Sequence, residues 1–356
     1  MYLQTHSYSI INIIEGVKYM KLTVLGPGCW GLTLAWLMND NFDEITVWGR
    51  EQDLNEDLIN NKHCSKPLEV QLDKKVVITS DLKSAITDAD VILSVVATSG
   101  VRPVCEQLKA AGINPKTPLV NASKGLELNS LMRMSEVIKD VLPEQKVVIL
   151  SGPTLAKEVL QGKPTAACVA CEDMETAEFV QKACNVPNRF RLYTNNDVIG
   201  VELGGSLKNV IAIASGFAHE MNLGDNCMGS LLTRGMAEIV RLSIRLGANP
   251  STLYGLSGMG DLIATCSSPM SRNYTVGSML GKGKKIDDIL LELGSVAEGV
   301  KTSKAVCDLA KKLDIEVPVS SAIYEAVYTD ITPQEVLSKL MNRKLKKEEN
   351  YDKVRG

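Results

Sequence analysis

Histidine is scarce in this sequence, which contains three histidines among 356 residues. Zinc sites usually combine several histidine and cysteine side chains, and no second Cys-x-x-Cys pair accompanies Cys168 and Cys171. If residues 166–170 form a strand, the spacing also directs these two thiols to opposite faces of a sheet. We therefore predict no metal site.

A surplus of positive charge is missing as well. The 39 basic and 42 acidic residues give a formal net charge of −3 at pH 7. Nucleic-acid-binding domains usually carry an excess of lysine and arginine, so we predict no nucleic-acid partner. Any bound anion must be held by a local site.

Long apolar runs are also lacking. The run at residues 9–14 is too short for a membrane span, and the segment around it lacks the basic start and small-residue end of a secretory leader. We interpret residues 1–19 as an N-terminal extension outside the fold and predict no integral membrane association. The nine cysteines are scattered along the chain, which favours a reducing, cytoplasmic location with most thiols buried.

The length of the chain predicts two domains. In residues 20–196, short β-rich runs alternate with helical patterns, which is typical of an α/β domain with a doubly wound, mostly parallel sheet of the Rossmann type. The predicted strands are 21–25, 44–48, 75–79, 91–96, 118–121, 146–150, 166–170 and 189–193.

Helical spacing of apolar residues dominates residues 197–343 and predicts an all-helical second domain. The clearest predicted helices are 197–221, 229–247, 302–313 and 332–343. The apolar helices after residue 229 also make a homodimer our expectation for the assembly. Residues 344–356 are highly charged, and we expect a disordered tail there.

Three glycines at the end of the first predicted strand, Gly26, Gly28 and Gly31, form the pattern G-x-G-x-x-G. Gly26 allows a tight turn from strand to helix, Gly28 lets a pyrophosphate approach the backbone, and Gly31 lets the helix pack close to the strand. Glycine-rich turns without a ligand are common. The βα alternation that follows favours dinucleotide binding here.

The second predicted strand is followed by Gly49 and Arg50, about twenty residues after the glycines. An NAD-selective site usually has an acidic residue here, whereas a guanidinium suits the 2′-phosphate of NADP. We therefore predict that NADP(H) is accepted at least as well as NAD(H). In the alternative interpretation, Arg50 is a solvated loop residue and Glu51 binds the ribose.

Two further polar segments, 121–127 and 150–159, follow predicted strands at their carboxyl ends, where open α/β sheets bind ligands. Lys124 can reach into the crevice from the first segment, although a lysine in such a loop is usually a solvated charge.

Lys208 lies in an otherwise apolar helix, above Gly204 and Gly205. Helical side chains lean toward the N-terminus, so these glycines should leave a hollow beside the lysine. Desolvation in such a hollow would make Lys208 a plausible proton donor or acceptor near neutral pH. The alternative is a lysine at the domain boundary that is paired with Glu202 or Asp261.

The helical half supplies the other polar candidates: Asp261, Ser271, Arg272, Asn273 and Glu298. Arg272 suits an anion clamp because its planar fork can bind a phosphate with two hydrogen bonds. A surface salt bridge is the commoner role for such a residue.

Together, these segments closely resemble the bacterial NAD(P)-dependent sn-glycerol-3-phosphate dehydrogenases from about residue 21 to about residue 340. The matching stretches, in the family's order, are GPGCWG, SKGLE, SGPTLAKEV, GVELGGSLKNVIAIASG, SGMGDLIATC, SRNYTVG and VAEGVKT. The resemblance implies a Rossmann domain that binds the cofactor and a helical domain that closes over the substrate. It also implies reduction of dihydroxyacetone phosphate to sn-glycerol 3-phosphate, which supplies the phospholipid backbone.

Residue roles follow from the resemblance position by position. Besides the three glycines, it implies cofactor contacts for Cys29, Trp30, Arg50, Lys124, Ala156, Arg272, Val296 and Glu298. It implies substrate contacts for Lys124, Gly152, Thr154, Lys208, Asp261, Ser271, Arg272 and Asn273. Lys208 would transfer the proton with Lys124 nearby, and Arg272 would bind the phosphate. Two positions depart from the family's pattern. Cys29 stands where the family commonly has Ser or Asn, and Pro27 replaces the usual Ala.

Two alternatives remain at this level. One is another dehydrogenase of the same two-domain plan, such as a β-hydroxyacid or ketopantoate-type reductase, against which the phosphate clamp Arg272 argues. The other is a catalytically silent dinucleotide-binding regulator, against which the presence of both Lys124 and Lys208 argues.

Overall fold

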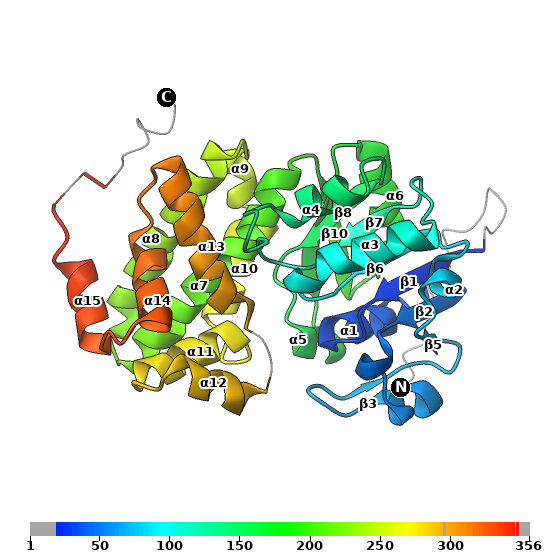
Figure 1. Ribbon diagram of the computed structural model, residues 1–356, viewed down its shortest axis with the longest axis horizontal. Helices are drawn as coiled ribbons and strands as arrows, with labels where there is room; N and C mark the ends of the chain where they lie inside the picture. Colours follow the sequence, from blue (N-terminus) through cyan, green and yellow to red (C-terminus); the bar gives the residue numbers. More distant parts are fainter. Residues whose placement is uncertain (1–18, 295–296, 346, 349–356) are drawn as a thin grey trace, which may run out of the picture.

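The computed structural model describes residues 19–294, 297–345, 347 and 348, and it divides into an α/β half and a helical half (Figure 1). Residues 1–18 of the predicted extension lie outside the described residues, as do Val296 and residues 346 and 349–356 of the predicted tail.

An eight-stranded sheet with the order β10-β9-β8-β7-β6-β1-β2-β5 forms the centre of the α/β half. Its strands are β1 (Lys21–Leu25), β2 (Glu44–Trp48), β5 (Val77–Thr79), β6 (Val91–Ser94), β7 (Leu119–Asn121), β8 (Val147–Ser151), β9 (Thr165–Ala170) and β10 (Phe190–Asn195). Strands β5, β2, β1, β6, β7 and β8 are parallel, whereas β9 pairs antiparallel with β8 and parallel with β10. The predicted strands and the mostly parallel sheet are therefore confirmed.

Helices cover both faces of this sheet because its central strands are apolar on both sides. They are α1 (Cys29–Leu37), α2 (Leu82–Ile86), α3 (Val101–Ala111), α4 (Met134–Val141), α5 (Ala156–Leu160) and α6 (Met174–Cys184). Cys168 and Cys171 belong to apolar clusters on different sides of the sheet, so the predicted orientation of the two thiols is confirmed. Five of the nine cysteines are buried.

A short segment between β2 and β5 was not expected from the sequence. It contains the turns η1 (Glu51–Asp53) and η2 (Asp57–Asn61) and an antiparallel hairpin of β3 (His63–Cys64) and β4 (Val70–Gln71). Strands of two residues are too short to show an alternating pattern, which explains why they could not be predicted.

The second half is helical, as predicted, and begins with the long helix α7 (Val198–Glu220). The other elements are α8 (Gly224–Arg245), α9 (Pro250–Leu253), η4 (Leu256–Gly260), α10 (Asp261–Cys266), α11 (Arg272–Gly281), α12 (Ile286–Leu293), α13 (Glu298–Leu313), α14 (Pro318–Tyr328) and α15 (Pro333–Met341). Helices α8 and α13 begin about one turn earlier than predicted, because their first turns are polar or glycine-containing and lack apolar periodicity.

Helix α7 is the central element of the helical half and also contacts strand β8 of the sheet. By length and composition it could cross a membrane, but 89% of its most apolar window is buried inside the protein. Two glycines let α11 approach it closely: a Cβ on Gly216 would overlap the Tyr274 carbonyl oxygen, and a Cβ on Gly277 would overlap that of Ile213. The two helix backbones are therefore in direct contact, which fixes α11 relative to α7.

This contact predicts a large effect for one added methyl group. Gly277→Ala should lower the stability by roughly 1–3 kcal/mol, because the obstacle is helix backbone that cannot rotate away. Gly229→Ala is the matched control: Gly229 also lies within a helix, and a Cβ there meets nothing within 4 Å. Alanine at that position should stabilise by about 0.5–1 kcal/mol. Urea unfolding of both variants measures the difference, and equal midpoints would contradict the packing argument.

Candidate active site

The glycine-rich loop has the geometry that each glycine was expected to provide. Gly26 has a φ of 110°, and Gly31 leaves no room for a Cβ because that atom would overlap the Gly26 carbonyl oxygen. Gly28 begins α1 without a side-chain cap, and a Cβ there meets nothing within 4 Å. The start of α1 thus lacks a side-chain cap and has free space beside Gly28, as an anion site requires.

The two residues after Gly28 differ in orientation. The indole of Trp30 packs edge-on against Phe190, with ring centroids 6.5 Å apart. Cys29 is half-buried; burial raises the pKa of its thiol, and the positive charge of Arg272 opposes this rise. The first residue of α11 in the helical half therefore lies within electrostatic range of the glycine-rich loop.

Two lysines from different halves converge on one carboxylate. Lys124, in the loop after β7, donates from Nζ to Oδ2 of Asp261 at 2.7 Å and to the Gly152 carbonyl at 2.9 Å. Lys208, on α7, donates to Oδ1 of Asp261 and to the Thr265 hydroxyl at 2.5 Å. Asp261, the first residue of α10, is only 1% exposed. One buried carboxylate thus bridges both amines.

Burial shapes the acidity of Lys208, which is 6% exposed. Its pKa is lowered to about 8, mainly by desolvation and also by the neighbouring charge of Lys124, while the charge of Asp261 acts in the opposite direction. Of the two carboxylates considered from the sequence, the partner is Asp261, because Glu202 instead accepts hydrogen bonds from Arg133 and Ser135. An amine with this pKa can both donate and accept a proton near neutral pH.

The expectation of a hollow beside Lys208 is wrong. A Cβ on Gly204 would meet the Ser257 carbonyl oxygen at 2.7 Å, and a Cβ on Gly205 would overlap the Ser151 hydroxyl. The glycines admit the backbone of η4 and the end of β8 rather than leaving empty space. They bring α7 against the carboxyl edge of the sheet, which is why Lys208 and Lys124 can share one carboxylate.

The other predicted substrate residues form two groups. Gly152, with a φ of 150°, follows β8, and its carbonyl accepts hydrogen bonds from Lys124 and from Thr154. Ala156 begins α5 in the same segment. Ser271 caps the N-terminus of α11.

The Asn273 amide in this second group is already engaged in the structure. Its Nδ2 donates to Asn209 on α7 at 2.9 Å, and its Oδ1 accepts from the backbone N–H of Gly299 at 2.9 Å. Asn273 therefore holds the start of α13 against α7. Arg272, beside it, is exposed, and no described residue forms a hydrogen bond or ion pair with its guanidinium.

Glu298 joins the two halves of the protein. Its carboxylate accepts hydrogen bonds from the backbone N–H of Thr98 at 3.3 Å and from the Thr98 hydroxyl at 2.8 Å. Thr98 lies in the turn η3 (Thr98–Gly100), which follows β6, the neighbour of β1 in the sheet. Sequence reasoning missed Thr98, although its place just after a predicted strand was a usable signal.

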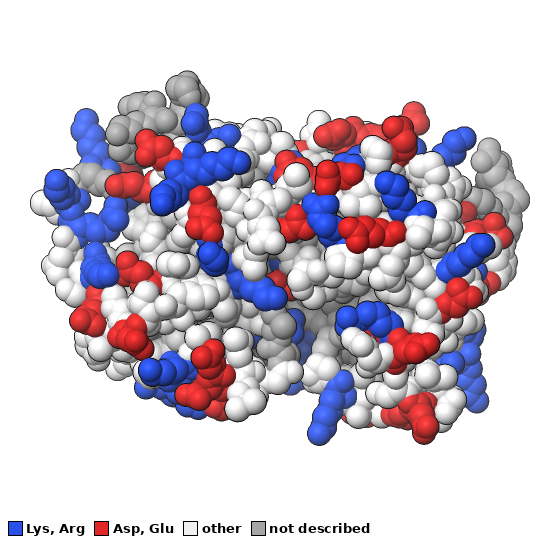
Figure 2. All heavy atoms as spheres, in the orientation of Figure 1, with Lys and Arg blue, Asp and Glu red and all other residues white. Residues whose placement is uncertain are grey.

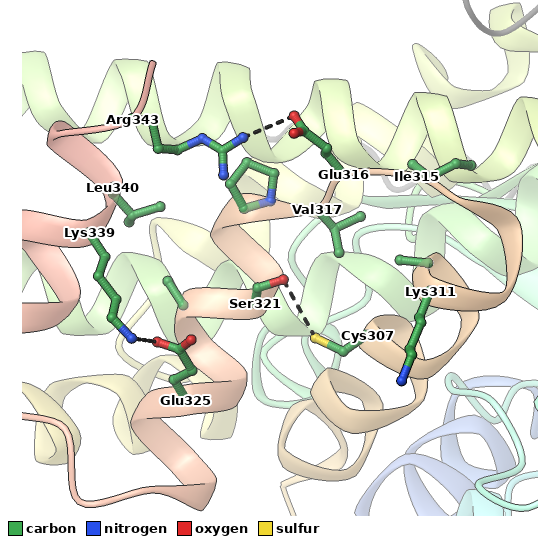
Figure 3. A pocket seen from close by; sticks show the side chains of 13 residues that line it. Cys307, Lys311, Ile315, Glu316, Val317, Ser321, Glu325, Lys339, Leu340 and Arg343 are labelled. Atoms are coloured by element: carbon green, nitrogen blue, oxygen red, sulfur yellow. Dashed lines mark hydrogen bonds and ion pairs between the residues drawn. The ribbon is translucent and has the colours of Figure 1, made fainter.

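A separate cavity of about 380 Å³ lies between α13, α14 and α15 (Figure 3). Ion pairs border it between Lys339 and Glu325 at 2.7 Å and between Arg343 and Glu316 at 2.9 Å. None of the predicted site residues lines this cavity.

Figure 2 shows basic and acidic side chains mixed over the visible face, with a hollow between the two halves.

Comparison with known proteins identifies one family over nearly the whole chain. The N-terminal profile of NAD-dependent glycerol-3-phosphate dehydrogenase matches residues 21–177, and the C-terminal profile matches residues 197–338. Glycerol-3-phosphate dehydrogenase (NAD(P)+) of Lysinibacillus sphaericus is 44% identical over 333 residues, covering 92% of this chain and 98% of that protein. The Enterococcus faecalis protein of the same name is 42% identical, with 93% and 98% covered.

A solved structure shows the same overall fold. The crystal structure of a glycerol-3-phosphate dehydrogenase from Coxiella burnetii superimposes with a TM-score of 0.85 at 31% identity, covering 91% of this chain and 99% of that one.

The bond between Thr98 and Glu298 predicts a role in cofactor binding. Thr98→Val removes the hydroxyl donor and should raise the KM for the dinucleotide about three- to tenfold, because the Glu298 carboxylate loses a partner that orients it. Thr98→Ser keeps the donor and should restore the KM. Steady-state kinetics with varied NADH checks both variants, and an unchanged KM in Thr98→Val would contradict the role.

Proposed function

The chain belongs to the NAD-dependent glycerol-3-phosphate dehydrogenase family, and we propose that Lys208, Asp261 and Lys124 form its catalytic centre. As a member, it is an NAD(P)-dependent oxidoreductase that interconverts dihydroxyacetone phosphate and sn-glycerol 3-phosphate. The observation that carries the proposed centre is the buried Asp261 carboxylate, which is shared by amines from the two halves of the protein.

The residues around the glycine-rich loop fit a dinucleotide. The uncapped start of α1 and the open space at Gly28 suit a pyrophosphate, and the positive charge of Arg272 in the helical half acts on Cys29 in the same loop. When bound there, NAD(P)H supplies the hydride for the ketone carbon. Among the described residues, those proposed to hold the cofactor are Gly26, Gly28, Cys29, Trp30, Gly31, Arg50, Lys124, Ala156, Arg272 and Glu298. Val296, also implied by the resemblance, lies outside them.

Lys208 supplies the proton in the proposed mechanism. During reduction its ammonium group stabilises the negative charge that develops on the carbonyl oxygen and then donates a proton to it. Asp261 keeps the Lys208 side chain oriented and connects it to Lys124, whose side chain is more exposed, 20% against 7%. In the oxidation direction, neutral Lys208 accepts the proton from the alcohol.

The substrate phosphate is assigned to the start of α11. Arg272 offers a free planar fork there, and Ser271 and Asn273 flank it with polar groups. Gly152 and Thr154 complete the proposed pocket on the side of the sheet, next to Lys124. In this proposal one cationic group binds the phosphate and the two lysines lie at the ketone on the central carbon.

The wider assignments rest on the same family membership. We assign residues 20–196 to the cofactor domain and residues 197–343 to the substrate domain, with residues 1–19 and 344–356 as terminal extensions. A cytoplasmic homodimer that supplies glycerol phosphate to phospholipid synthesis is part of this proposal. Leu291 on α12 and Met341 on α15 support an association through the helical half, because they are apolar and 84% and 74% exposed.

Replacement of Lys208 tests the catalytic assignment. Lys208→Ala should lower kcat by about 10²–10⁴-fold, as loss of a general acid typically does. In the unaltered enzyme, ketone reduction requires the ammonium form and should decline as the pH rises through about 8, whereas alcohol oxidation requires the neutral amine and should rise over the same range.

Asp261→Asn provides the control for these pH profiles. The Asp261 charge raises the pKa of Lys208, so its removal should move both profiles to lower pH. Near-normal turnover of Lys208→Ala, or profiles that do not move in Asp261→Asn, would show that another group transfers the proton.

We predict that Arg272 binds the phosphate of the substrate. Arg272→Ala should raise the KM for dihydroxyacetone phosphate about ten- to a hundredfold, because a charge-assisted hydrogen bond is lost. Turnover of unphosphorylated dihydroxyacetone at saturating NADPH should change little. If only the KM for NADPH changes, the guanidinium serves the cofactor and the phosphate clamp lies elsewhere.

A further inference from the structure

The arginine in the turn after β2, Arg50, forms an ion pair with Asp53. Arg50 donates from Nε to Asp53 Oδ2 at 2.7 Å and from its terminal NH2 to Asp53 Oδ1 at 2.8 Å. These two parallel bonds engage both oxygens of the carboxylate. The side chains of Arg50 and Asp53 are 59% and 32% exposed, so the pair stands at the surface with one face toward solvent.

Packing places this turn beside the glycine-rich loop. Gly49 lies so close to the Pro27 ring and to Leu54 that a Cβ there would meet them at 2.7 Å and 2.8 Å. Pro27 directly precedes Gly28, where the pyrophosphate is assigned. In doubly wound sheets the adenosine ribose lies between this loop and the end of the second strand. The pair of Arg50 and Asp53 therefore borders the ribose 2′ position.

The local charge is negative despite Arg50. Residues 50–57 contain one arginine and four carboxylates, Glu51, Asp53, Glu56 and Asp57. The pair occupies the Nε and Nη2 side of Arg50. A 2′-phosphate therefore either displaces the Asp53 carboxylate or binds the remaining Nη donors with that anion nearby, and in both cases the Asp53 charge opposes it. A 2′-hydroxyl is neutral and can bind while the pair remains intact.

We propose that Asp53 determines cofactor selectivity, by competing with the 2′-phosphate of NADP(H) for Arg50 and so favouring NAD(H). This inference rests on the proposed binding of the dinucleotide at the glycine-rich loop. It refines the expectation drawn from Arg50 alone: the guanidinium is present, but Asp53 reduces the advantage that it gives to NADP(H).

Five variants isolate this effect, one of which is Arg50→Ala alone as the reference for the double variant. Asp53→Asn keeps the shape of the side chain and removes its charge. Glu56→Gln is the charge-matched control, because it removes one negative charge from the same segment and no described residue forms a hydrogen bond or ion pair with the Glu56 carboxylate. Glu51→Gln tests the alternative in which Glu51 binds the ribose. Asp53→Asn combined with Arg50→Ala tests whether the effect requires the guanidinium.

The readout is the Kd of NADPH and of NADH, each measured by cofactor fluorescence without substrate. Asp53→Asn should lower the Kd of NADPH by roughly three- to tenfold and leave that of NADH within about twofold. The shift should persist in about 1 M salt, where screening acts within ~3 Å, whereas any effect of Glu56→Gln should vanish there. With Arg50→Ala, the Asp53→Asn substitution should no longer favour NADPH.

Three results would overturn the inference. These are an unchanged ratio of the two Kd values in Asp53→Asn, an equal shift in Glu56→Gln at high salt, and a loss of NADH affinity confined to Glu51→Gln. The binding measurement is independent of the proton-transfer assignment. The activity of Lys208→Ala, whether lost or kept, therefore does not bear on this inference. If the unaltered chain binds neither dinucleotide, the proposed function itself fails and this inference fails with it.

Discussion

The proposed active site depends on the Asp261 carboxylate, which lies between two ammonium groups in the interior of the protein. Without this carboxylate, the two ammonium groups would repel each other strongly in a medium from which water is excluded. The carboxylate offsets this repulsion and satisfies both amines with hydrogen bonds. Because Lys124 comes from the sheet and Lys208 and Asp261 from the helical half, the same contact also couples the two halves mechanically.

The glycines of α7 make this arrangement possible. Gly204 and Gly205 admit η4 and the end of β8, and Gly216 admits α11. In each case the absence of a side chain lets backbone, or a hydroxyl at a strand end, approach the helix. The cost in helix propensity is offset by the burial of nearly the whole surface of α7. The helix therefore serves as a rigid mount for Lys208.

The sequence predicted the architecture well, because apolar patterns report burial directly. The strands β1 and β2 were found at their observed bounds, and the glycine-rich loop has the steric roles assigned to it. It predicted poorly what depends on contacts across the chain. The glycines beside Lys208 signalled special packing, but the sequence could not show that η4, some fifty residues later, fills the space. The partners of Glu298 and Arg50 were hidden for the same reason, since a single side chain carries no pattern.

The burial of α7 also constrains how the chain folds during synthesis. The α/β half is complete when residue 195 has been made, but α11, against which α7 packs most closely, ends at residue 281. At ~5–20 residues per second, translation leaves this apolar helix without its main partner for at least several seconds. The nascent polypeptide thus passes through a stage in which the apolar surface of α7 is not yet covered by α11. Binding of a chaperone at that stage would protect the chain from aggregation.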